Sequence, residues 1–485
     1  MELEEVLLKY EPVVGIEIHA QLKTKSKAYC GDKNEFGSTP NTLISPISLG
    51  HPGTLPKFNK KVINHALKLG LALDCDITRY MHFDRKNYFY ADLPKGYQIT
   101  QDTTPICNGG FIEIKGEDGK EKQIEITRIH MEEDAGKSIH DLDPFHTLVD
   151  LNRAGVPLIE IVSEPEIRSS GEAYQYVLEV RKLVRYIGIC DGNMEEGSLR
   201  CDANISVRLK GAEKFGTKVE VKNMNSSSNV KKAIEYEIER QIELIENGGE
   251  VVHETRSFNA ANGGTISMRH KEKANDYRFF PEPDLQPVIV TQEYIEKIRK
   301  TLPLLPKELY IKFTNKFGLS DYDSIILIEE KEIALYFLEI TKHTKNYKTA
   351  ANIVNGPIKA HLNEFVKHIS EFSISAIRIA ELIQLIDDGK VSNSVATSKV
   401  FTQMLESDLS AEEIAKNNNW IQDSDTDSLS EFVKQVIAKY PEKVEEYKSG
   451  KKGLIGLFMG EVMKLSRGKA DPKLANQLVI AELEK

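Results

Sequence analysis

Apolar and polar positions alternate in short runs over about the first 290 residues, and clusters of glycine, proline and asparagine separate the runs. This pattern is typical of strands joined by turns. The runs that predict strands lie at residues 12–18, 111–114, 124–129 and 157–162. Helices are predicted over residues 60–73 and 172–186, and a third begins at an N-cap near Asn229 and ends at Asn247, before a glycine pair.

A proline-rich stretch at residues 281–306 is followed by sequence that predicts helices to the end of the chain. A polar stretch at residues 417–427 interrupts this helical part. The pattern therefore predicts an α+β protein, in which a domain built on an antiparallel sheet with helices comes first and all-helical parts follow. The domains that we expect are residues 1–295, 296–415 and 416–485.

The composition, with 40% hydrophobic and 28% charged residues, is that of an ordinary globular protein. Lys and Arg number 64 against 74 Asp and Glu, a net charge of −10, which argues against a general basic surface for nucleic acid but allows local basic patches. No apolar run approaches the ~20 residues that cross a bilayer, and the N-terminus has the wrong charge for a signal peptide. Five cysteines without a C-x-x-C pair argue against disulfides, so we expect a cytoplasmic protein without a membrane segment.

The familiar catalytic and phosphate-binding motifs are absent from the sequence. It has no G-x-x-x-x-G-K-[ST] or G-x-G-x-x-G loop, no H-E-x-x-H pair and no G-x-S-x-G nucleophile elbow. The serine cluster at residues 226–228 directly precedes a predicted helix and is better explained by helix capping. Any activity of this chain must therefore rest on other side chains.

Glutamates sit between aliphatic residues in several predicted strands. The glutamates of these aliphatic-Glu-aliphatic triples are Glu17, Glu113, Glu125, Glu160 and Glu220. Because side chains alternate across a strand, each of them points away from its two neighbours. Glu113 and Glu125 flank a charged hairpin turn at residues 115–120, and we interpret both as solvent-exposed.

The other three glutamates favour a functional role. Glu17 shares a strand face with His19, and the two could reach the same cation. Glu160 has apolar residues on both faces of its strand, so its carboxylate needs a partner, a metal or a raised pKa. Glu220 lies between two lysines on its own face, a mixed-charge stripe that suits an anionic ligand.

Residues 128–134 and 198–208 alternate in the same way, with His, Glu, Asp and Arg on one face of each strand. Two explanations remain open for such a face. It is either the wet side of a half-solvated antiparallel sheet or the lining of a polar reaction cavity. For a cavity, Mg²⁺ suits the acidic residues with an imidazole better than Zn²⁺ does, since Zn²⁺ favours thiolates or several imidazoles.

Collinear blocks along nearly the whole chain resemble one known family. The blocks are EPVVGIEIHAQLK (11–23), DRKNYFYADLPKGYQ (84–98), RIHMEEDAGK (128–137), DLNRAGVPLIEIV (150–162), MEEGSLRCDAN (194–204), VEVKNMN (219–225) and DYRFFPEPDL (276–285). Together they resemble the B-subunit (GatB) family of aspartyl/glutamyl-tRNA amidotransferases. Residues 460–464 and 468–472 are similar to the YqeY-type tail of that family.

The resemblance implies a cradle-like N-terminal domain, a helical domain and a YqeY-like tRNA-binding tail. It implies a cytosolic heterotrimer with an amidase (A) subunit and a small C subunit that acts on misacylated Glu-tRNA(Gln), Asp-tRNA(Asn) or both. In that reaction ATP phosphorylates the side-chain carboxylate of the esterified amino acid, and ammonia from the amidase subunit displaces the phosphate. The alternatives are a ligase for a free amino acid and a catalytically silent tRNA-binding scaffold.

The resemblance also suggests roles for individual residues. His19 and Glu132 match Mg²⁺ ligands, with Glu17 beside them, and Lys86 matches a residue on the ammonia route. Glu17, Glu160 and Glu220 are expected to line the same catalytic cavity. On grounds of charge alone, the candidate ATP-phosphate contacts, each of which could equally be a structural salt-bridge partner, are Arg85, Arg153, Arg200 and Lys222.

The sequence departs from the family at an early zinc knuckle of the form C-x-C followed by C-P-x-C. The matching positions read Cys30-Gly-Asp32 and Ser45-Pro-Ile-Ser48. One thiolate cannot hold a structural zinc ion, so we predict that Zn²⁺ is absent. The loop over residues 34–56 should instead be held by packing and hydrogen bonds.

The tail combines an apolar stripe with basic residues. The stripe, which is predicted to be core, consists of Leu454, Leu457, Phe458, Val462 and Leu465. Lysines and arginines gather nearby at Lys464, Arg467, Lys469 and Lys473. They form either a solvated face or, as the resemblance favours, a salt-sensitive contact with the tRNA backbone.

Overall fold

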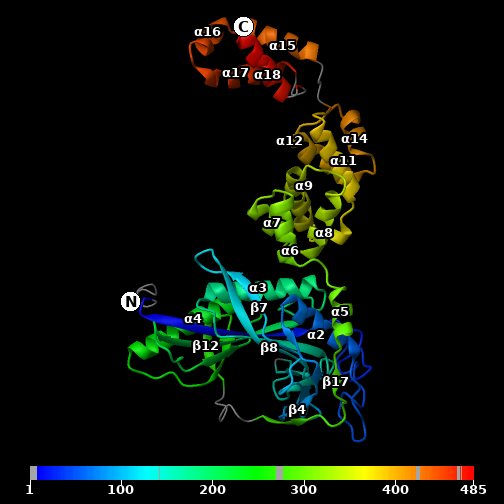
Figure 1. Ribbon diagram of the computed structural model, residues 1–485, viewed down its shortest axis with the longest axis vertical. Helices are drawn as coiled ribbons and strands as arrows, with labels where there is room; N and C mark the ends of the chain where they lie inside the picture. Colours follow the sequence, from blue (N-terminus) through cyan, green and yellow to red (C-terminus); the bar gives the residue numbers. More distant parts are fainter. Residues whose placement is uncertain are drawn as a thin grey trace. The chain divides into compact units, whose positions relative to one another are not determined.

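The computed structural model describes residues 8–140, 142–268, 277–421, 426–466, 470 and 472–484, and the chain forms two compact units, Met1–Leu305 and Pro306–Lys485 (Figure 1). The first unit continues past residue 295, to Leu305, because α5 (Gln292–Arg299) packs on α2 (Lys60–Ala72). Ile295 and Ile298 of α5 are buried in the core of this unit. The boundaries expected at 295 and 415 remain predictions.

The first unit is a mixture of strands and helices, as predicted for its fold class. Its helices besides α2 and α5 are α3 (Ser170–Tyr186) and α4 (Ser227–Glu246). Its strands are β1 (Tyr10–Gln21), β2 (Asp76–Ile77), β3 (Tyr80–Met81), β4 (Asp84–Asn87), β5 (Tyr97–Thr100), β6 (Cys107–Asn108), β7 (Phe111–Lys115), β8 (Glu121–Glu133), β9 (Lys137–Ile139), β10 (Leu148–Asp150), β11 (Pro157–Ser163), β12 (Leu199–Leu209), β13 (Val219–Lys222), β14 (Thr255–Asn259), β15 (Gly264–Ser267), β16 (Arg278–Pro281) and β17 (Val288–Ile289).

One large sheet organises this unit. Its strand order is β15-β14-β13-β12-β1-β11-β8-β6-β2, and β7 pairs with β8 beside this path. The long central strands β12, β1, β11 and β8 are antiparallel neighbours, whereas β13 and β14 run parallel. A separate small sheet, β16-β4-β5, carries Lys86.

The large sheet has one apolar face, and helices cover it. Along β1, the side chains of Val14, Ile16, Ile18 and Ala20 are almost completely buried. In Figure 1, α3 and α4 lie along the sheet, with α3 contacting β7 and β1, and α4 contacting β12. Each buried aliphatic side chain contributes about 1.5–3 kcal/mol, so this face anchors the fold and turns the alternate residues of β1 to the other side.

The serine cluster caps a helix, as predicted, but the position of the cap differs. The hydroxyl of Ser226 accepts a hydrogen bond from the backbone N–H of Asn229, and α4 begins at Ser227. Asn229 therefore lies inside the first turn and is not the N-cap. Ser226 has extended backbone angles (φ −155°, ψ 157°), which let its side chain reach the free N–H groups of that turn.

The second unit is helical over its described residues. Its α-helices are α6 (Pro306–Ile311), α7 (Asp321–Leu327), α8 (Lys331–Ile340), α9 (Tyr347–Ile353), α10 (Lys359–Glu364), α11 (Ala376–Asp387), α12 (Asn393–Val395), α13 (Phe401–Glu406), α14 (Ala411–Asn417), α15 (Thr426–Lys439), α16 (Pro441–Lys448), α17 (Ile455–Leu465) and α18 (Pro472–Leu483). Across the parts of the chain that the structure describes, no helix has the length and apolar character needed to span a membrane.

Residues from α15 to α18 form a hydrophobic core of their own, and the predicted stripe is partly wrong. Phe458 and Val462 are buried there, but Leu457 and Leu465 are exposed. Leu457 points about 100° away from Phe458 around the helix, and Leu465 is the last residue of α17. Of the basic tail residues, Arg467 and Lys469 and the side chain of Lys473 lie outside the described part of the structure.

A buried histidine should make the stability of the first unit depend on pH. His65 in α2 is 4% exposed, and its Nε2 lies 3.0 Å from the carbonyl oxygen of Lys23. Burial lowers the pKa of His65 from 6.5 to about 4. Because the unfolded chain then takes up a proton first, the stability that His65 contributes is complete above pH 6.5 and is lost as the pH falls towards 4.

We expect this loss to be about 2 kcal/mol at pH 5 and to reach roughly 3 kcal/mol below pH 4. It can be measured as the fall in melting temperature between about pH 7.5 and pH 5 in the wild type and in His65→Gln, whose amide can still donate to the Lys23 carbonyl. Carboxylates titrate in both proteins and lower both melting temperatures. Only the wild type also loses the contribution of His65, so the variant should show the smaller fall. Equal falls in the two proteins would contradict the assignment.

Candidate functional site

The polar face of the large sheet brings together side chains from four strands. On β1, Glu17 and His19 point away from the helix-covered side. In the strand register, His19 lies opposite Glu160 of β11, and Glu17 lies opposite Asp202 of β12. Glu160 in turn lies opposite His130 of β8, so the next strand continues the same polar face.

His19, His130, Glu132 and Glu160 form what we call the imidazole cluster. One carboxylate oxygen of Glu160 lies 3.2 Å from His19 Nε2 and 3.3 Å from His130 Nε2. The carboxylate of Glu132 lies 3.9 Å from His19 Nε2 and 3.8 Å from His130 Nε2. The ligand atoms of His19, Glu132 and Glu160 are all within 4.8 Å of one another, which is close enough for one cation to bind all three.

The imidazoles and carboxylates of this cluster shift one another's pKa values. Burial lowers the pKa of His130, but Glu160 and Glu132 outweigh that effect and raise it to about 9. The pKa of His19 is raised by the same two carboxylates against the effect of burial. Burial opposes ionisation of Glu160, yet the two imidazoles hold its pKa well below the usual range.

Glu17, Asp202 and Glu220 form a second group, which we call the carboxylate cluster. Their ligand oxygens also lie within 4.8 Å of one another. Burial, with a contribution from Glu160, raises the pKa of Glu17. Lys222 donates to Asp202 and lies 2.8 Å from a carboxylate oxygen of Glu220, so one cation already balances part of this negative charge. The structure thus groups Glu17 with Asp202 and Glu220, whereas His19 lies with Glu132 and Glu160.

The other predicted phosphate contacts have structural partners. Arg200 donates to Asp134 at 2.8 Å, and Arg153 donates to the carbonyl oxygens of Ala135 and Gly136. Arg85 forms two hydrogen bonds of 2.6 and 2.9 Å with buried Glu282. These contacts agree with the salt-bridge alternative for the three arginines, although Arg200 also lies opposite His19 in the strand register. Lys222 is the one of the four that bonds directly to members of a cluster.

Lys86 lies on β4 among aromatic rings. Its Nζ is 4.8 Å from the ring centroid of Tyr277 and 6.0 Å from that of Tyr88. Burial and the neighbouring Glu132 raise the pKa of the Tyr88 phenol. Because Glu132 affects the pKa of Tyr88, the aromatic rings around Lys86 lie near the Glu132 carboxylate of the imidazole cluster.

Sequence reasoning did not select His130, Asp202 or Asn204 as site residues, although each lies on a polar strand face. Asn204 donates to Glu17 at 2.8 Å, and the other two complete the clusters. The alternation of residues 128–134 and 198–208 was the available signal. It could not identify these residues, because alternation gives the face of a strand but not its neighbours or its register.

Three of the four positions that match the zinc knuckle of the family lie together. Cys30 Sγ is 3.3 Å from Ser48 Oγ, and the Ser48 hydroxyl donates to Asp32. The nearby loop is fastened by Lys27, which is fully buried and donates to the carbonyl oxygen of Leu43 at 2.7 Å. Hydrogen bonds and packing thus connect these residues to one another and the loop to Lys27.

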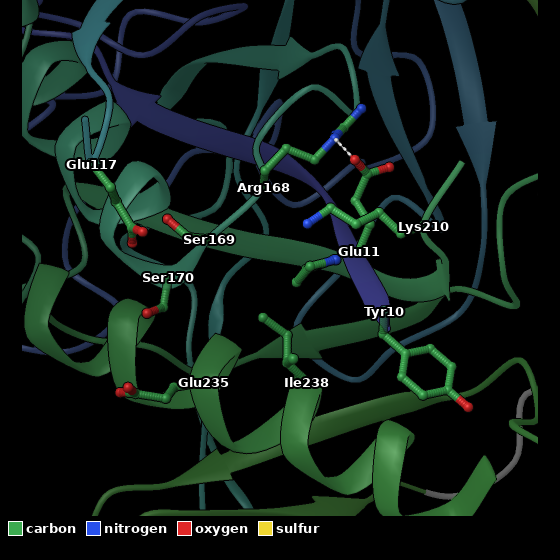
Figure 2. Close-up of a pocket in the computed structure, with 10 residues that line it drawn as sticks. Tyr10, Glu11, Glu117, Arg168, Ser169, Ser170, Lys210, Glu235 and Ile238 are labelled. Carbon is green, nitrogen blue, oxygen red and sulfur yellow. Dashed lines mark ion pairs between the residues drawn. The ribbon is translucent and has the colours of Figure 1, made fainter. Parts of the chain in front are cut away.

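Two pockets lie along the large sheet. The first, which we call the β1 pocket, has a volume of about 370 Å³ and includes Glu17 and Asn204 in its lining. The second, of about 360 Å³, lies beside α3 and α4 on the helix-covered side (Figure 2). Figure 2 shows its Arg168 paired with Glu11, and none of its lining residues belongs to either cluster. The β1 pocket is thus the one that borders the candidate site.

Comparisons with known proteins identify the same family along most of the chain. A family model described as the GatB/GatE catalytic domain matches residues 12–296, and one described as the GatB domain matches residues 335–483. The B-subunit of the aspartyl/glutamyl-tRNA(Asn/Gln) amidotransferase of Thermodesulfovibrio yellowstonii is 49% identical over 477 residues, which cover 98% of this chain and 100% of that protein. The protein of the same name from Persephonella marina is 48% identical over 473 residues, with 97% and 99% covered.

Proposed function

The chain belongs to the GatB family of amidotransferase B-subunits, and on that premise we propose that it catalyses the ATP-dependent amidation of misacylated tRNA. The substrate is Glu-tRNA(Gln), Asp-tRNA(Asn) or both, as the names of its relatives indicate. Ammonia comes from glutamine through a partner amidase subunit. The observation that carries the proposal is the meeting of the imidazole and carboxylate clusters on one polar sheet face.

The donor set fits Mg²⁺. His19, Glu132 and Glu160 offer one imidazole and two carboxylates, and Glu17, Asp202 and Glu220 offer oxygen ligands only. We propose His19, Glu132 and Glu160 as one ligand set and the carboxylate cluster as a second. When bound, Mg²⁺ supplies neutralisation of the charge that develops on the transferred phosphoryl group.

The remaining residues have distinct proposed roles. Lys222, beside Asp202 and Glu220, contacts phosphate oxygens of ATP. Arg200 and Arg153 hold Asp134, and Arg85 anchors β4, the strand that presents Lys86. Lys86, which lies against the ring of Tyr277, borders the route by which ammonia reaches the acyl phosphate.

This function requires partners that we propose from the family alone: the amidase (A) subunit, a small C subunit and the tRNA, all in the cytoplasm. A non-catalytic tRNA-binding scaffold is not favoured. A scaffold would gain nothing from burying Glu160 between two imidazoles on a sheet face that also carries a cluster of three further carboxylates.

The test is reconstitution of the heterotrimer with glutamine, ATP, Mg²⁺ and radiolabelled Glu-tRNA(Gln) or Asp-tRNA(Asn). We expect amidated tRNA and release of ADP, both abolished when ATP is omitted. Ammonium chloride should replace glutamine as the nitrogen source. If a heterotrimer that still hydrolyses glutamine converts neither misacylated tRNA, the result would contradict the proposed activity and favour the scaffold alternative.

The zinc knuckle also yields a prediction. We propose that the purified chain contains no zinc, because Asp32, Ser45 and Ser48 replace three of the four thiolates. Elemental analysis should find less than about 0.1 zinc per chain. Stability should not change on treatment with a chelator, whereas a structural zinc site would lose metal and stability together.

A further inference from the structure

The pocket beside α3 and α4, which we call the α3 pocket, is not used by the proposed reaction. It lies on the helix-covered side of the large sheet, and none of its lining residues belongs to the imidazole or the carboxylate cluster (Figure 2). Its volume of about 360 Å³ is within the range of pockets that hold small organic ligands. The charged residues that line it are Glu11, Glu117, Arg168, Lys210 and Glu235.

One side of the α3 pocket is acidic. Figure 2 shows Glu117 and Glu235 on this side, together with the hydroxyls of Ser169 and Ser170. Glu117, from the turn between β7 and β8, lies against the first turn of α3, where a Cβ at Gly171 would come 3.1 Å from its carboxylate oxygen. Both glutamates are exposed, and within the described chain neither has an ion-pair partner. Their negative charge is therefore available to a ligand.

The opposite side of the pocket is basic. The Nη1 group of Arg168 donates to the carbonyl oxygens of Pro165 and Ile167, at 2.7 and 3.1 Å, which holds the guanidinium in place. Its Nε lies 3.9 Å from Glu11, so this carboxylate balances part of the positive charge. Lys210, just after β12, extends towards the middle of the pocket in Figure 2 and has no ion-pair partner among the described residues. The pocket thus presents free positive charge across from the two glutamates.

This arrangement of charge limits the ligands that fit. Three carboxylates against two cations disfavour a polyanion such as a nucleotide. Among the described residues, the groups that could hold a metal ion are the two clusters, and the pocket glutamates are not among them. An apolar ligand would bury the charges without compensation. A small dipolar ligand satisfies both sides, and the buried side chains of Pro12 and Ile238 can accept its apolar part.

We propose that the α3 pocket binds a free α-amino acid in its zwitterionic form, with the ammonium group at Glu117 and Glu235 and the carboxylate at Lys210 and Arg168. An α-amino acid carries both charges on a small frame, and charge-assisted hydrogen bonds at its two ends would fix its orientation. Its side chain then faces the apolar floor. This site goes beyond the proposed function, in which glutamine binds to the partner amidase subunit.

The experiment uses the full-length chain without its partner subunits, so that the glutamine site of the amidase is absent. Isothermal titration calorimetry measures the Kd of each common L-amino acid without ATP or tRNA. The pocket variants are Lys210→Met and Glu235→Gln, which remove one charge from each side. Their matched controls are Lys214→Met and Glu239→Gln, because both residues are exposed nearby in the chain and neither lines the pocket. Circular dichroism checks that each variant folds.

We expect saturable binding of at least one amino acid, with a Kd that each pocket variant raises by about tenfold or more and that each control leaves unchanged. The N-acetylated form of that amino acid, which lacks the ammonium group, should not compete, and neither should its decarboxylated amine.

Absence of binding by every amino acid up to about 10 mM would overturn the proposal. Binding that His19→Ala removes and both pocket variants keep would also overturn it, because the ligand would then lie on the polar face of the sheet. The titration needs no ATP, tRNA or partner subunit, so these results are separable from a failure of the proposed amidation.

Discussion

Replacement of Glu160 by glutamine is expected to lower the rate of tRNA amidation by about 100-fold or more, while glutamine hydrolysis by the partner amidase stays intact. Glu160 is the carboxylate that both His19 and His130 contact, at 3.2 and 3.3 Å. Glutamine keeps the size of the side chain but removes the charge. The proposed metal site then loses an anionic ligand, and the two imidazoles lose the carboxylate that both of them contact.

The control for this experiment has the same local sequence. Glu125, like Glu160, stands between two isoleucines in a strand, but it is exposed and belongs to neither cluster. Glu125→Gln should therefore retain full amidation. His19→Ala should behave as Glu160→Gln does, because it removes the imidazole from the same ligand set. Full amidation by Glu160→Gln or His19→Ala would show that the imidazole cluster is not needed for the reaction.

Replacement of Glu237 by alanine is expected to destabilise the first unit by about 3–5 kcal/mol. Glu237, in α4, is fully buried, and its carboxylate accepts from Arg240 at 2.6 Å, Gln241 at 3.0 Å and Thr265 at 3.1 Å. Arg256 lies 3.6 Å away. Removing the carboxylate leaves two partly buried arginines and two buried donors without their shared acceptor.

Thermal unfolding followed by circular dichroism should therefore begin at a lower temperature in Glu237→Ala. Glu239→Ala, on the exposed side of the same helix, should match the wild type. The single tryptophan, Trp420, lies in the second unit, so its fluorescence reports that unit separately and should not change. Equal shifts in both signals, or no shift in either, would contradict a role confined to the first unit.

The sequence predicted the fold class and the faces of the strands better than the pairing between them. Alternation along β1 correctly places Ile16 and Ile18 in the core and Glu17 and His19 on the polar side. Alternation cannot show that His130 lies opposite Glu160, since register depends on how distant strands align. The partner of Arg85, Glu282, is 197 positions away and carried no local signal.

The two faces of β1 have a consequence for how this chain can change. One twelve-residue strand supplies both the hydrophobic anchor and polar groups of the candidate site, and the two alternate along its second half, from Ile16 to Gln21. Inserting or deleting a single residue within it would send glutamate and histidine into the helix-packed interior and isoleucine into the cavity. Point substitutions can therefore adjust binding or packing there, but length variation is confined to connecting loops such as residues 34–56. A library meant to diversify substrate choice should vary side chains along β1 and keep its length fixed.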